Sequence, residues 1–419
     1  MNLATIAYRN LGRHKVRSFL SILTIVLACI LGMFMLTLIT GMKGDMKRNI
    51  LAYYTGAIQI RHADYNTYDY LNPIHLYVQN EAAVREKLLQ VDGVTQAVGR
   101  ITTGGQIYID ENPDDDRPGE KFAAMAMGID IPAEKNILDP ESMLAKGRLP
   151  AMGSREVILG YGLAEKVGLD VGDKFAFMTA TAARGVNAMT FEIVGLVNFT
   201  MGSHNNAYFI LPFDTMQNFA RMEGGSLEIL LMTTDPETAE TQLEAVDALL
   251  ASDSALGYLE TKLWKNQGEF YAMMGLGNFI YSGYVLFFLA LGATVIMNTT
   301  MMVIYERYRE IGILGAMGMK PNELVTLFFL EALFAGIISA VIGISVGSVI
   351  ILILEQVGMN FGDIYSEMNM EISNVIYPDL KWFHIVIMSV YTVGISALVT
   401  LLPCRKAARI EPVDAIRAN

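Results

Sequence analysis

Four long stretches of the chain contain no charged side chain. They run from Ser18 to Met42, from Phe270 to Tyr305, from Ala332 to Leu354 and from Trp382 to Cys404. A helix needs about 20 apolar residues to cross the hydrocarbon core of a bilayer. The sequence therefore predicts an α-helical membrane protein with four transmembrane helices. At about 1.5 Å of rise per residue the second helix would be longer than the core is thick, so part of it is expected to stand outside the bilayer as a stalk.

The charges that flank these stretches predict the orientation of the chain. Basic side chains lie before the first stretch and after the last one, namely Arg9, Arg13, Lys15, Arg17, Arg405, Lys406, Arg409 and Arg417. Residues 43–269 and 355–381 are rich in acidic side chains instead. Because short basic flanks stay on the cytoplasmic side, we expect both termini in the cytoplasm and residues 43–269 outside.

These observations divide the chain into nine expected parts. They are a cytoplasmic amphipathic helix at 1–17, a first span at 18–42, an extracytoplasmic domain at 43–269, a second span with a stalk extension at 270–305, a cytoplasmic element at 306–321, a third span at 322–354, a short extracytoplasmic loop at 355–381, a fourth span at 382–404 and a cytoplasmic tail at 405–419.

The N-terminal segment has apolar residues at helical spacing and Arg9, Arg13 and Arg17 four apart on another face. This pattern predicts an amphipathic helix on the inner surface of the membrane. The alternative is a basic tail that sets topology without forming a surface helix.

Residues 43–269 read as a soluble domain. Runs typical of strands occur at Ala57–Arg61, Gln106–Asp110, Lys174–Met178, Phe191–Val197, Ala207–Leu211 and Leu227–Met232. Runs typical of helices lie between them, notably Glu81–Gln90 and Pro236–Leu250. Strands and helices alternate without a strict βαβ period, which predicts an α+β domain with a mixed sheet. The acidic stretch Asp110–Glu120 reads as a solvated turn, and a calcium loop there lacks the ligand spacing of an EF-hand.

Composition and motifs exclude several classes of function. The net charge of -12 argues against a nucleic-acid partner. Both cysteines, Cys29 and Cys404, fall in apolar stretches, which argues against a disulfide framework. No phosphate-binding glycine loop and no histidine pair at metal-ligand spacing occurs. We therefore expect no catalytic residue, no metal and no bound cofactor on this chain.

The segment Tyr305–Pro321, YERYREIGILGAMGMKP, lies between the second and third apolar stretches. Charges of both signs come first, at Glu306, Arg307, Arg309 and Glu310, followed by Gly312, Gly315 and Gly318 at intervals of three. Each glycine weakens a helix by about 1 kcal/mol relative to alanine, but a glycine edge lets another surface approach the backbone closely. The pattern favours a docking element for a cytoplasmic partner. A hydrophilic turn without a partner is the alternative.

Glu331 is the one carboxylate that can lie well inside a predicted span. An ionisable side chain at that depth usually faces a partner or water, which makes it a functional candidate. Equally, Glu331 can sit at the inner interface, paired with a basic residue of the first helix.

Several sequence blocks resemble the FtsX-like permeases, which include macrolide-exporter and lipoprotein-releasing membrane subunits. They are RNLGRHKVRSFLSILTIVLA, GRLPAMGSREVILGYGLAEKVGLDVGDKFAF, ERYREIGILGAMGMKPNEL with FFLEALFAGIISAVIG, and LPCRKAARIEPVDAIRA, in the family's order along the whole chain. The resemblance implies four helices, a dimer of identical or related permeases, and two cytoplasmic ABC ATPase subunits that hold ATP and Mg²⁺. It makes Glu306–Met319, including Ala316 and Met319, the ATPase-coupling element.

The resemblance also implies a mechanism, in which the long second helix carries ATPase closure to the outer domain (mechanotransmission). The macrolide-exporter type carries its ATPase on the same chain, whereas here a separate ATPase subunit is expected. The segment GMKGDMKRNILAYYTGAIQIRHADY is closer to the lipoprotein-releasing branch. We therefore expect a permease of the bacterial inner membrane that extracts or translocates lipoproteins or another amphiphile, with a possible periplasmic accessory protein. The alternatives are drug or peptide efflux and a signalling permease that moves nothing and activates cell-wall hydrolases.

Overall fold

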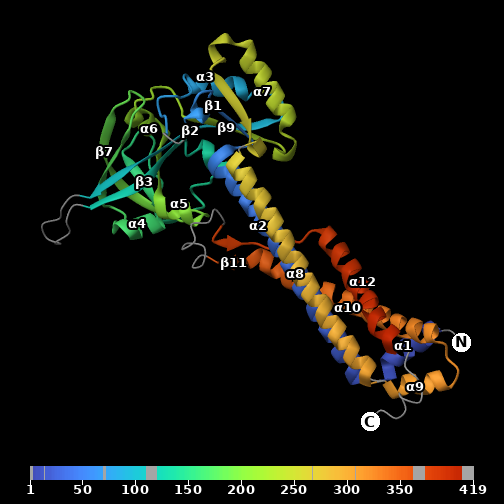
Figure 1. Cartoon of the computed structure of the whole chain (residues 1–419). Coiled ribbons are helices and arrows are strands. Elements are labelled where there is room, and N and C mark those ends of the chain that lie inside the picture. Colours follow the sequence, from blue (N-terminus) through green and yellow to red (C-terminus); the bar gives the residue numbers. More distant parts are fainter. Residues whose placement is uncertain are drawn as a thin grey trace. The chain divides into compact units, whose positions relative to one another are not determined.

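The structure is a computed structural model that describes residues 3–13, 15–68, 72–109, 120–266, 268–306, 308–361 and 373–407. It divides into two compact units (Figure 1). The helical unit comprises Met1–Lys43, Gly275–Met359 and Ile376–Asn419, and the β-rich unit comprises Gly44–Met274 and Asn360–Val375. Arg307 and most of the acidic stretch, residues 110–119, lie outside the described residues, and so does the calcium alternative placed there.

The helical unit is built from six helices among the described residues. They are α1 (Leu3–Arg13), α2 (Lys15–Asn49), α8 (Gly268–Glu306), α9 (Tyr308–Ala316), α10 (Pro321–Val357) and α12 (Trp382–Ala407). Three helices are long and apolar enough to cross a membrane, at Ser18–Thr55, Pro321–Val357 and Trp382–Arg405. In α8 the described apolar stretch is Phe279–Val295, so the count of four spanning helices stays a prediction.

Helix α8 is continuous over 39 residues, from Gly268 to Glu306. That length corresponds to roughly 58 Å, against a hydrocarbon core of about 30 Å. A single helix of this length agrees with the expected stalk. Helix α2 also continues beyond the apolar run that ends at Met42, and it passes into a π-helical turn, η1 (Ile50–Thr55).

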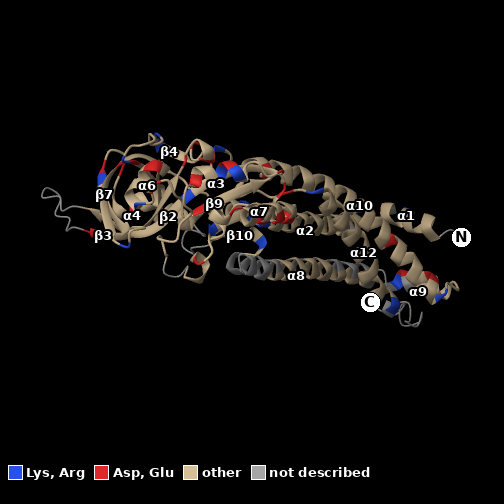
Figure 2. Cartoon of the chain, turned by 90° about the horizontal axis from the view of Figure 1, so that it is seen from above, with Lys and Arg blue, Asp and Glu red and all other residues tan. Residues whose placement is uncertain are grey.

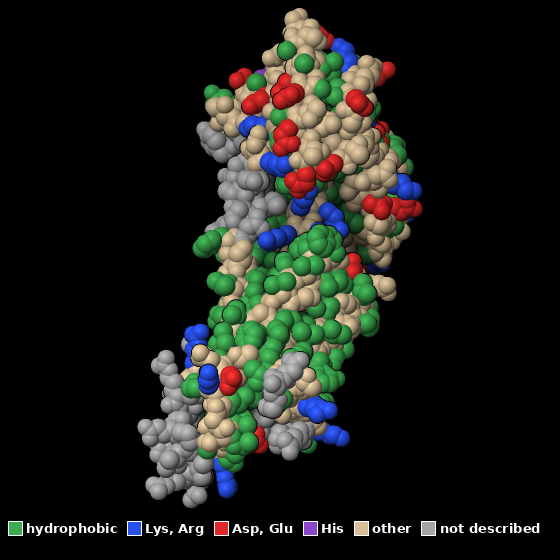
Figure 3. Space-filling view, turned by 90° about the vertical axis from the view of Figure 1, so that its right-hand side faces the viewer, with side chains coloured by type: hydrophobic (Ala, Val, Ile, Leu, Met, Phe, Trp, Pro, Cys, Tyr) green, Lys and Arg blue, Asp and Glu red, His purple; other side chains and the backbone are tan. Residues whose placement is uncertain are grey.

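Small residues on α10 let its neighbours approach closely. A Cβ atom built on Gly343 would lie 2.9 Å from Cβ of Cys29 on α2, and one built on Gly336 would lie 2.9 Å from Cβ of Ser396 on α12. Close approach over small residues is a common way to pack helices in a membrane, where lipid removes the hydrophobic drive for association. Figure 3 shows hydrophobic side chains over most of one face of this unit, as a lipid environment requires.

The β-rich unit contains ten strands in one mixed sheet. They are β1 (Ile58–His62), β2 (Val94–Ile109), β3 (Glu120–Ile129), β4 (Leu144–Gly147), β5 (Glu156–Gly160), β6 (Lys174–Ala180), β7 (Val186–Val197), β8 (Tyr208–Pro212), β9 (Glu228–Thr233) and β10 (Leu259–Leu263). The helices of this unit are α3 (Glu81–Leu88), α4 (Tyr161–Val167), α5 (Gly202–Ala207), α6 (Phe213–Ala220) and α7 (Glu240–Ser252). Two short strands, β11 (Met359–Asn360) and β12 (Val375–Ile376), flank residues 361–374.

Six of these strands close into a ring. The pairing runs β2–β3–β8–β5–β7–β6 and returns to β2, with β3–β8 and β5–β7 parallel and the other pairs antiparallel. Closure leaves these strands without an open edge. Aromatic rings fill the interior, among them Phe175, Phe177, Phe191, Phe209 and Phe219. We call this part the ring lobe.

Strands β1, β9 and β10 form a second lobe on the same sheet, in the order β10–β1–β9–β2, while β4 pairs with β7 of the ring lobe. Helices α3 and α7 supply Val84, Leu88, Val246 and Leu250 to its buried cluster. Strand β2 belongs to both lobes, because Val94–Arg100 pair with β9 and Arg100–Ile109 pair with β3. We call this second part the α/β lobe.

Candidate functional site

Helix α9 and its ends form the candidate coupling element. The helix stops in a Schellman motif: the N–H of Gly318 donates to the carbonyl of Gly315 at 3.0 Å, and the N–H of Met319 donates to that of Leu314 at 3.2 Å. Gly318 has a φ of +91°, which glycine adopts without the steric penalty of other residues. Helix α10 then begins at Pro321, where Glu323 accepts from the Lys320 N–H at 2.9 Å.

The inner face of α9 is fixed to the bundle by apolar contacts. Leu314 and Met319 pack against Leu324 and Phe328 of α10 and Cys404 of α12. Contact between the residues on either side of the stop commonly accompanies a Schellman motif. The orientation of α9 in the helical unit is therefore set by buried side chains as well as by its short connections.

The outer face of α9 carries both apolar and charged side chains. Arg309, Glu310, Ile313, Ala316 and Met317 are exposed, and the exposed fractions of Ile313 and Met317 are 46% and 79%. The other four residues lie three or four positions from Ile313, so all five share one side of a helix. Charged side chains gather around α9, whereas the middles of α2 and α10 carry almost none (Figure 2).

The structure places the predicted coupling residues in different surroundings. Gly312 is buried and Gly315 is half-buried, so that part of the glycine edge faces the bundle. Gly318 lies beyond the end of α9 and stops the helix, so it does not continue that edge. Glu306 is exposed at the end of α8. Ile313 and Met317 were not among the predicted residues. Apolar side chains four apart beside an exposed charge pattern are the sequence signal that could have found them.

Glu331 lies on α10 beside the N-terminal helix. Its carboxylate accepts a hydrogen bond from the Asn10 side chain of α1, and its pairing with a basic residue of the first helix stays a prediction. Tyr8 of α1 packs edge-on against Phe334, with ring centroids 6.1 Å apart. Helix α1 therefore rests on α10. Arg9 is exposed on it, while the side chains of Arg13 and Arg17 are outside what the structure describes.

In the β-rich unit, a buried ion pair lies where β2 passes from one lobe to the other. Both side chains of the pair Arg100–Glu134 have no solvent exposure. Burial lowers the pKa of Arg100, but its charged and polar neighbours, Glu134 first, more than offset this, so the pKa lies above its ordinary value. Arg100 also donates to the carbonyl of Tyr53 in η1 at 3.2 Å. The pair thus fixes the end of the α2 continuation to the domain core.

His204 is enclosed by aromatic rings next to this pair. It stacks on Tyr208 with centroids 4.0 Å apart, and the ring of Tyr53 lies 4.6 Å away. Its Nε2 atom is buried without a hydrogen-bond partner among the described residues. Burial, aided by the charge of Arg100, lowers the pKa of His204 to about 3. The imidazole is therefore neutral and serves packing.

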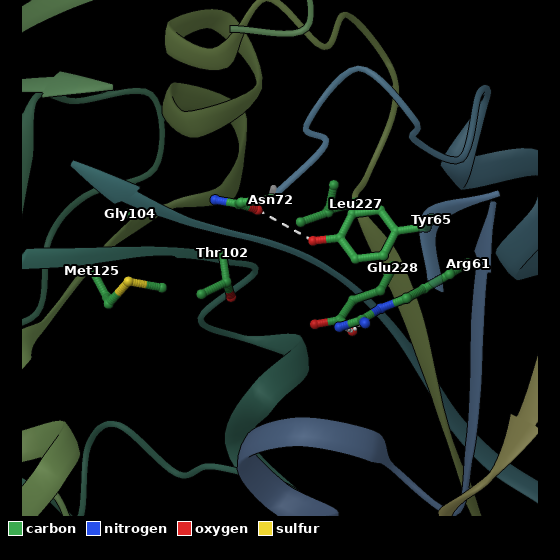
Figure 4. Close-up of a pocket in the computed structure, with 8 residues that line it drawn as sticks. All are labelled: Arg61, Tyr65, Asn72, Thr102, Gly104, Met125, Leu227 and Glu228. Atoms are coloured by element: carbon green, nitrogen blue, oxygen red, sulfur yellow. Dashed lines mark hydrogen bonds and ion pairs between the residues drawn. The ribbon is translucent and has the colours of Figure 1, made fainter. Parts of the chain in front are cut away.

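A cavity of about 440 Å³ opens in the β-rich unit between β1, β2 and β9 (Figure 4). Arg61 on its wall donates to one oxygen of Glu228 at 2.7 and 3.0 Å and lies over the ring of Tyr65. The Tyr65 hydroxyl donates to Asn72 at 3.2 Å. These polar groups satisfy one another. Among the described residues, no group of three acidic, histidine or cysteine side chains could hold a metal ion.

Comparison with models of known protein families identifies the family of the chain. The FtsX-like permease C-terminal model matches residues 282–412, and the MacB-like periplasmic core domain model matches residues 18–249, which is more than half of the chain. The chain belongs to the FtsX-like permease family. As such a permease it is a membrane subunit of ABC transporters of the LolC and MacB type.

Individual relatives of this FtsX-like permease are distant. The lipoprotein-releasing system transmembrane protein LolC of Neisseria meningitidis is 22% identical over 317 residues, 71% of this chain and 74% of LolC. The macrolide export ATP-binding/permease protein MacB of Chlorobaculum tepidum is 22% identical over 98% of this chain and 60% of MacB. An uncharacterized ABC transporter permease of Methanocaldococcus jannaschii is 21% identical over the full chain and 98% of its own length. The extracellular domain of the transporter YknZ matches 49% of this chain with a TM-score of 0.34 and 15% identity.

Proposed function

We propose that this permease works with a separate cytoplasmic ABC ATPase, which holds ATP and Mg²⁺ and docks on the outer face of α9. The observation that carries this proposal is the exposure of Ile313 and Met317 on a helix whose other face is fixed in the bundle. Exposed apolar side chains rimmed by charges are typical of protein interaction sites. Arg309 and Glu310 supply that rim.

The position of α9 in the chain suits a coupling role. Helix α8 ends at Glu306, and α9 begins at Tyr308. A displacement of α9 by the ATPase would therefore act directly on a continuous helix of 39 residues. We infer that α8 transmits this displacement toward the β-rich unit, with the N- and C-termini and α9 on the cytoplasmic side of a bacterial inner membrane.

The docking proposal is tested by co-expressing the full chain with its ATPase and measuring co-purification and ATP hydrolysis of the pair. Ile313→Asp and Met317→Asp place a charge in the apolar centre of the face. Each is expected to lower association by at least tenfold, as loss of a central apolar contact does at other interfaces. Val186→Asp, at an exposed apolar residue of β7, is the matched control. Association that survives both α9 variants would exclude this face.

For the substrate we propose a lipoprotein or a similar amphiphile. Several LolC proteins match at 20–24% identity, and that of Haemophilus influenzae matches over 95% of this chain and 92% of its own length. Efflux is the second candidate, because the MacB of C. tepidum matches 98% of the chain. We expect either activity to need a permease dimer, formed by two copies of this chain or by this chain and a related permease. A periplasmic accessory protein can complete the export route.

Depletion of the permease followed by membrane fractionation separates these functions. Release of lipoproteins predicts that they accumulate in the inner membrane on depletion. Normal lipoprotein distribution with increased drug sensitivity would favour efflux. If neither changes while cell-wall hydrolysis falls, the permease signals without transport. The Ile313→Asp variant should reproduce the depletion phenotype when the ATPase is present at normal levels.

A further inference from the structure

A cavity of about 370 Å³ lies within the helical unit, between α2, α8 and α12. Its walls are mainly apolar, with Leu36 and Ile39 from α2, Val285 and Leu289 from α8, and Phe383 and Ile387 from α12. The volume falls in the range of about 300–1,000 Å³ that small-molecule sites occupy. Three helices thus form a concave apolar surface, open on one side, that could accept a hydrocarbon chain.

The polar groups of the cavity differ in whether they already have partners. The Nδ1 atom of His384 accepts from the N–H of Lys381 at 3.1 Å, so its other nitrogen carries the proton and donates to Thr40 at 3.0 Å. Lys43 has a different environment. Its ammonium lies 5.9 Å from the ring centroid of Tyr281, and no carboxylate pairs with it within the described parts of the chain. By contrast, Lys381 pairs with Asp379 at 3.1 Å.

The cavity lies at the end of the bundle where a membrane interface is expected. Lys43 directly follows the uncharged run that begins at Ser18. Trp382 opens α12 with 77% of its surface exposed. Tryptophan and lysine at the ends of apolar helices mark the level of the lipid headgroups. The cavity lies just below this level, with a cation at its rim and no acidic side chain among its lining residues. Its apolar walls therefore suit an acyl chain, and the cation at its rim suits an anionic lipid headgroup.

We propose that this cavity binds one acyl chain of an anionic membrane phospholipid, whose phosphate contacts Lys43. The apolar walls hold the chain, and the Lys43 ammonium distinguishes the anionic headgroup from a zwitterionic one. A basic side chain near a membrane surface contributes about 1 kcal/mol toward an anionic lipid, which is about a fivefold preference. The site is independent of the α9 face and of the identity of the transported substrate.

The test is a lipid titration of the purified full chain in detergent, followed by native mass spectrometry. Phosphatidylglycerol and phosphatidylcholine with identical acyl chains are compared. The wild type should bind one phosphatidylglycerol about fivefold more tightly than phosphatidylcholine. Lys43→Gln should abolish the preference, and Lys43→Arg should retain it. Lys381→Gln is the matched control, because it removes a paired lysine from the same end of the bundle and should leave the preference unchanged.

Three results would overturn the proposal. The wild type could bind both lipids equally, or Lys43→Gln could keep the preference for phosphatidylglycerol. A neutral triacylated lipopeptide could also compete for the site as well as phosphatidylglycerol does, in the wild type and in Lys43→Gln alike. That last result would assign the cavity to a transported lipid anchor. Retention by Lys43→Arg together with loss in Lys43→Gln distinguishes a charge effect from a failure to fold.

Discussion

Arg100 and Glu134 face each other in a two-pronged ion pair, with Nε–Oε1 and Nη2–Oε2 distances of 2.6 and 2.8 Å and no solvent exposure on either side chain. Loss of one partner leaves the other charge buried and unpaired, which costs about 3–5 kcal/mol. We expect Glu134→Leu and Arg100→Met each to lower the thermal unfolding midpoint of the full chain. The double variant Arg100→Met with Glu134→Leu should unfold at a higher temperature than either single variant, because an apolar pair leaves no unpaired buried charge. A double variant as unstable as the sum of both singles would contradict this.

His204 gives the β-rich unit a pH dependence of known sign. Its folded pKa of about 3 lies below the ordinary value of 6.5, because burial disfavours the charged imidazolium. Between these values the unfolded chain binds more protons, so stability falls as the pH is lowered. The slope is about 1.4 kcal/mol per pH unit, or about 2 kcal/mol between pH 6.5 and 5.

Thermal unfolding of the full chain at several pH values measures this effect. His204→Gln cannot titrate, so its unfolding midpoint should change less between pH 6.5 and 5 than that of the wild type. Glu156, whose pKa is lowered to about 2 chiefly by its hydrogen bond to Arg148, loses its contribution at lower pH, below its ordinary value of 4.5. Parallel curves for wild type and His204→Gln would show that His204 does not carry the dependence.

Gly318 should tolerate asparagine better than valine. A Cβ atom at this position meets nothing within 4 Å, so the cost of a side chain comes from the φ of +91° alone. A left-handed conformation costs a β-branched residue about 1–2 kcal/mol, while asparagine adopts it more readily. We expect Gly318→Val to loosen the end of α9 and to speed hydrogen exchange of the Met319 backbone amide, which donates to the Leu314 carbonyl. In Gly318→Asn this amide should exchange at a rate near that of the wild type.

Gly343 should not accept a large side chain. It faces Cys29 of α2, and even a methyl group there would need the neighbour to move. Overpacking at such a contact typically costs about 1–3 kcal/mol. Gly343→Leu is therefore expected to lower the unfolding midpoint of the detergent-solubilised chain. Gly394→Leu is the control, since a Cβ on Gly394 of α12 meets nothing within 4 Å. Equal destabilisation by both variants would mean that the stability of the chain does not depend on the close approach of α10 to α2 at Gly343.

Much of the architecture could be predicted because it rests on local patterns. Uncharged runs located α2, α8, α10 and α12, since apolar length is a property of sequence alone. Strands β1, β6 and β9 were found within one or two residues. Strand β2 was found only at its C-terminal end, because Gly104 and Gly105 interrupt the strand pattern. In the structure a Cβ on Gly105 would collide with the Met178 carbonyl of β6, so this glycine permits the ring to close.

The candidate site was predicted less completely than the fold. The charges and the segment of α9 were identified, but the face it presents depends on how Leu314 packs against α10, which no local pattern gives. Gly318 could have been recognised as a helix stop, since Pro321 follows shortly after it. Arg100 could not have been recognised as buried, because its partner Glu134 lies 34 residues away and only the fold brings the two together.

The sharing of β2 between the two lobes limits how the β-rich unit can unfold. Residues on its first half are hydrogen-bonded into the α/β lobe and those on its second half into the ring lobe. A fluctuation that frees β2 therefore breaks both lobes at once, and no single cut in the chain yields two self-sufficient halves. Hydrogen exchange should reveal one cooperative opening event for the backbone amides on either side of Arg100, rather than two events of different free energy.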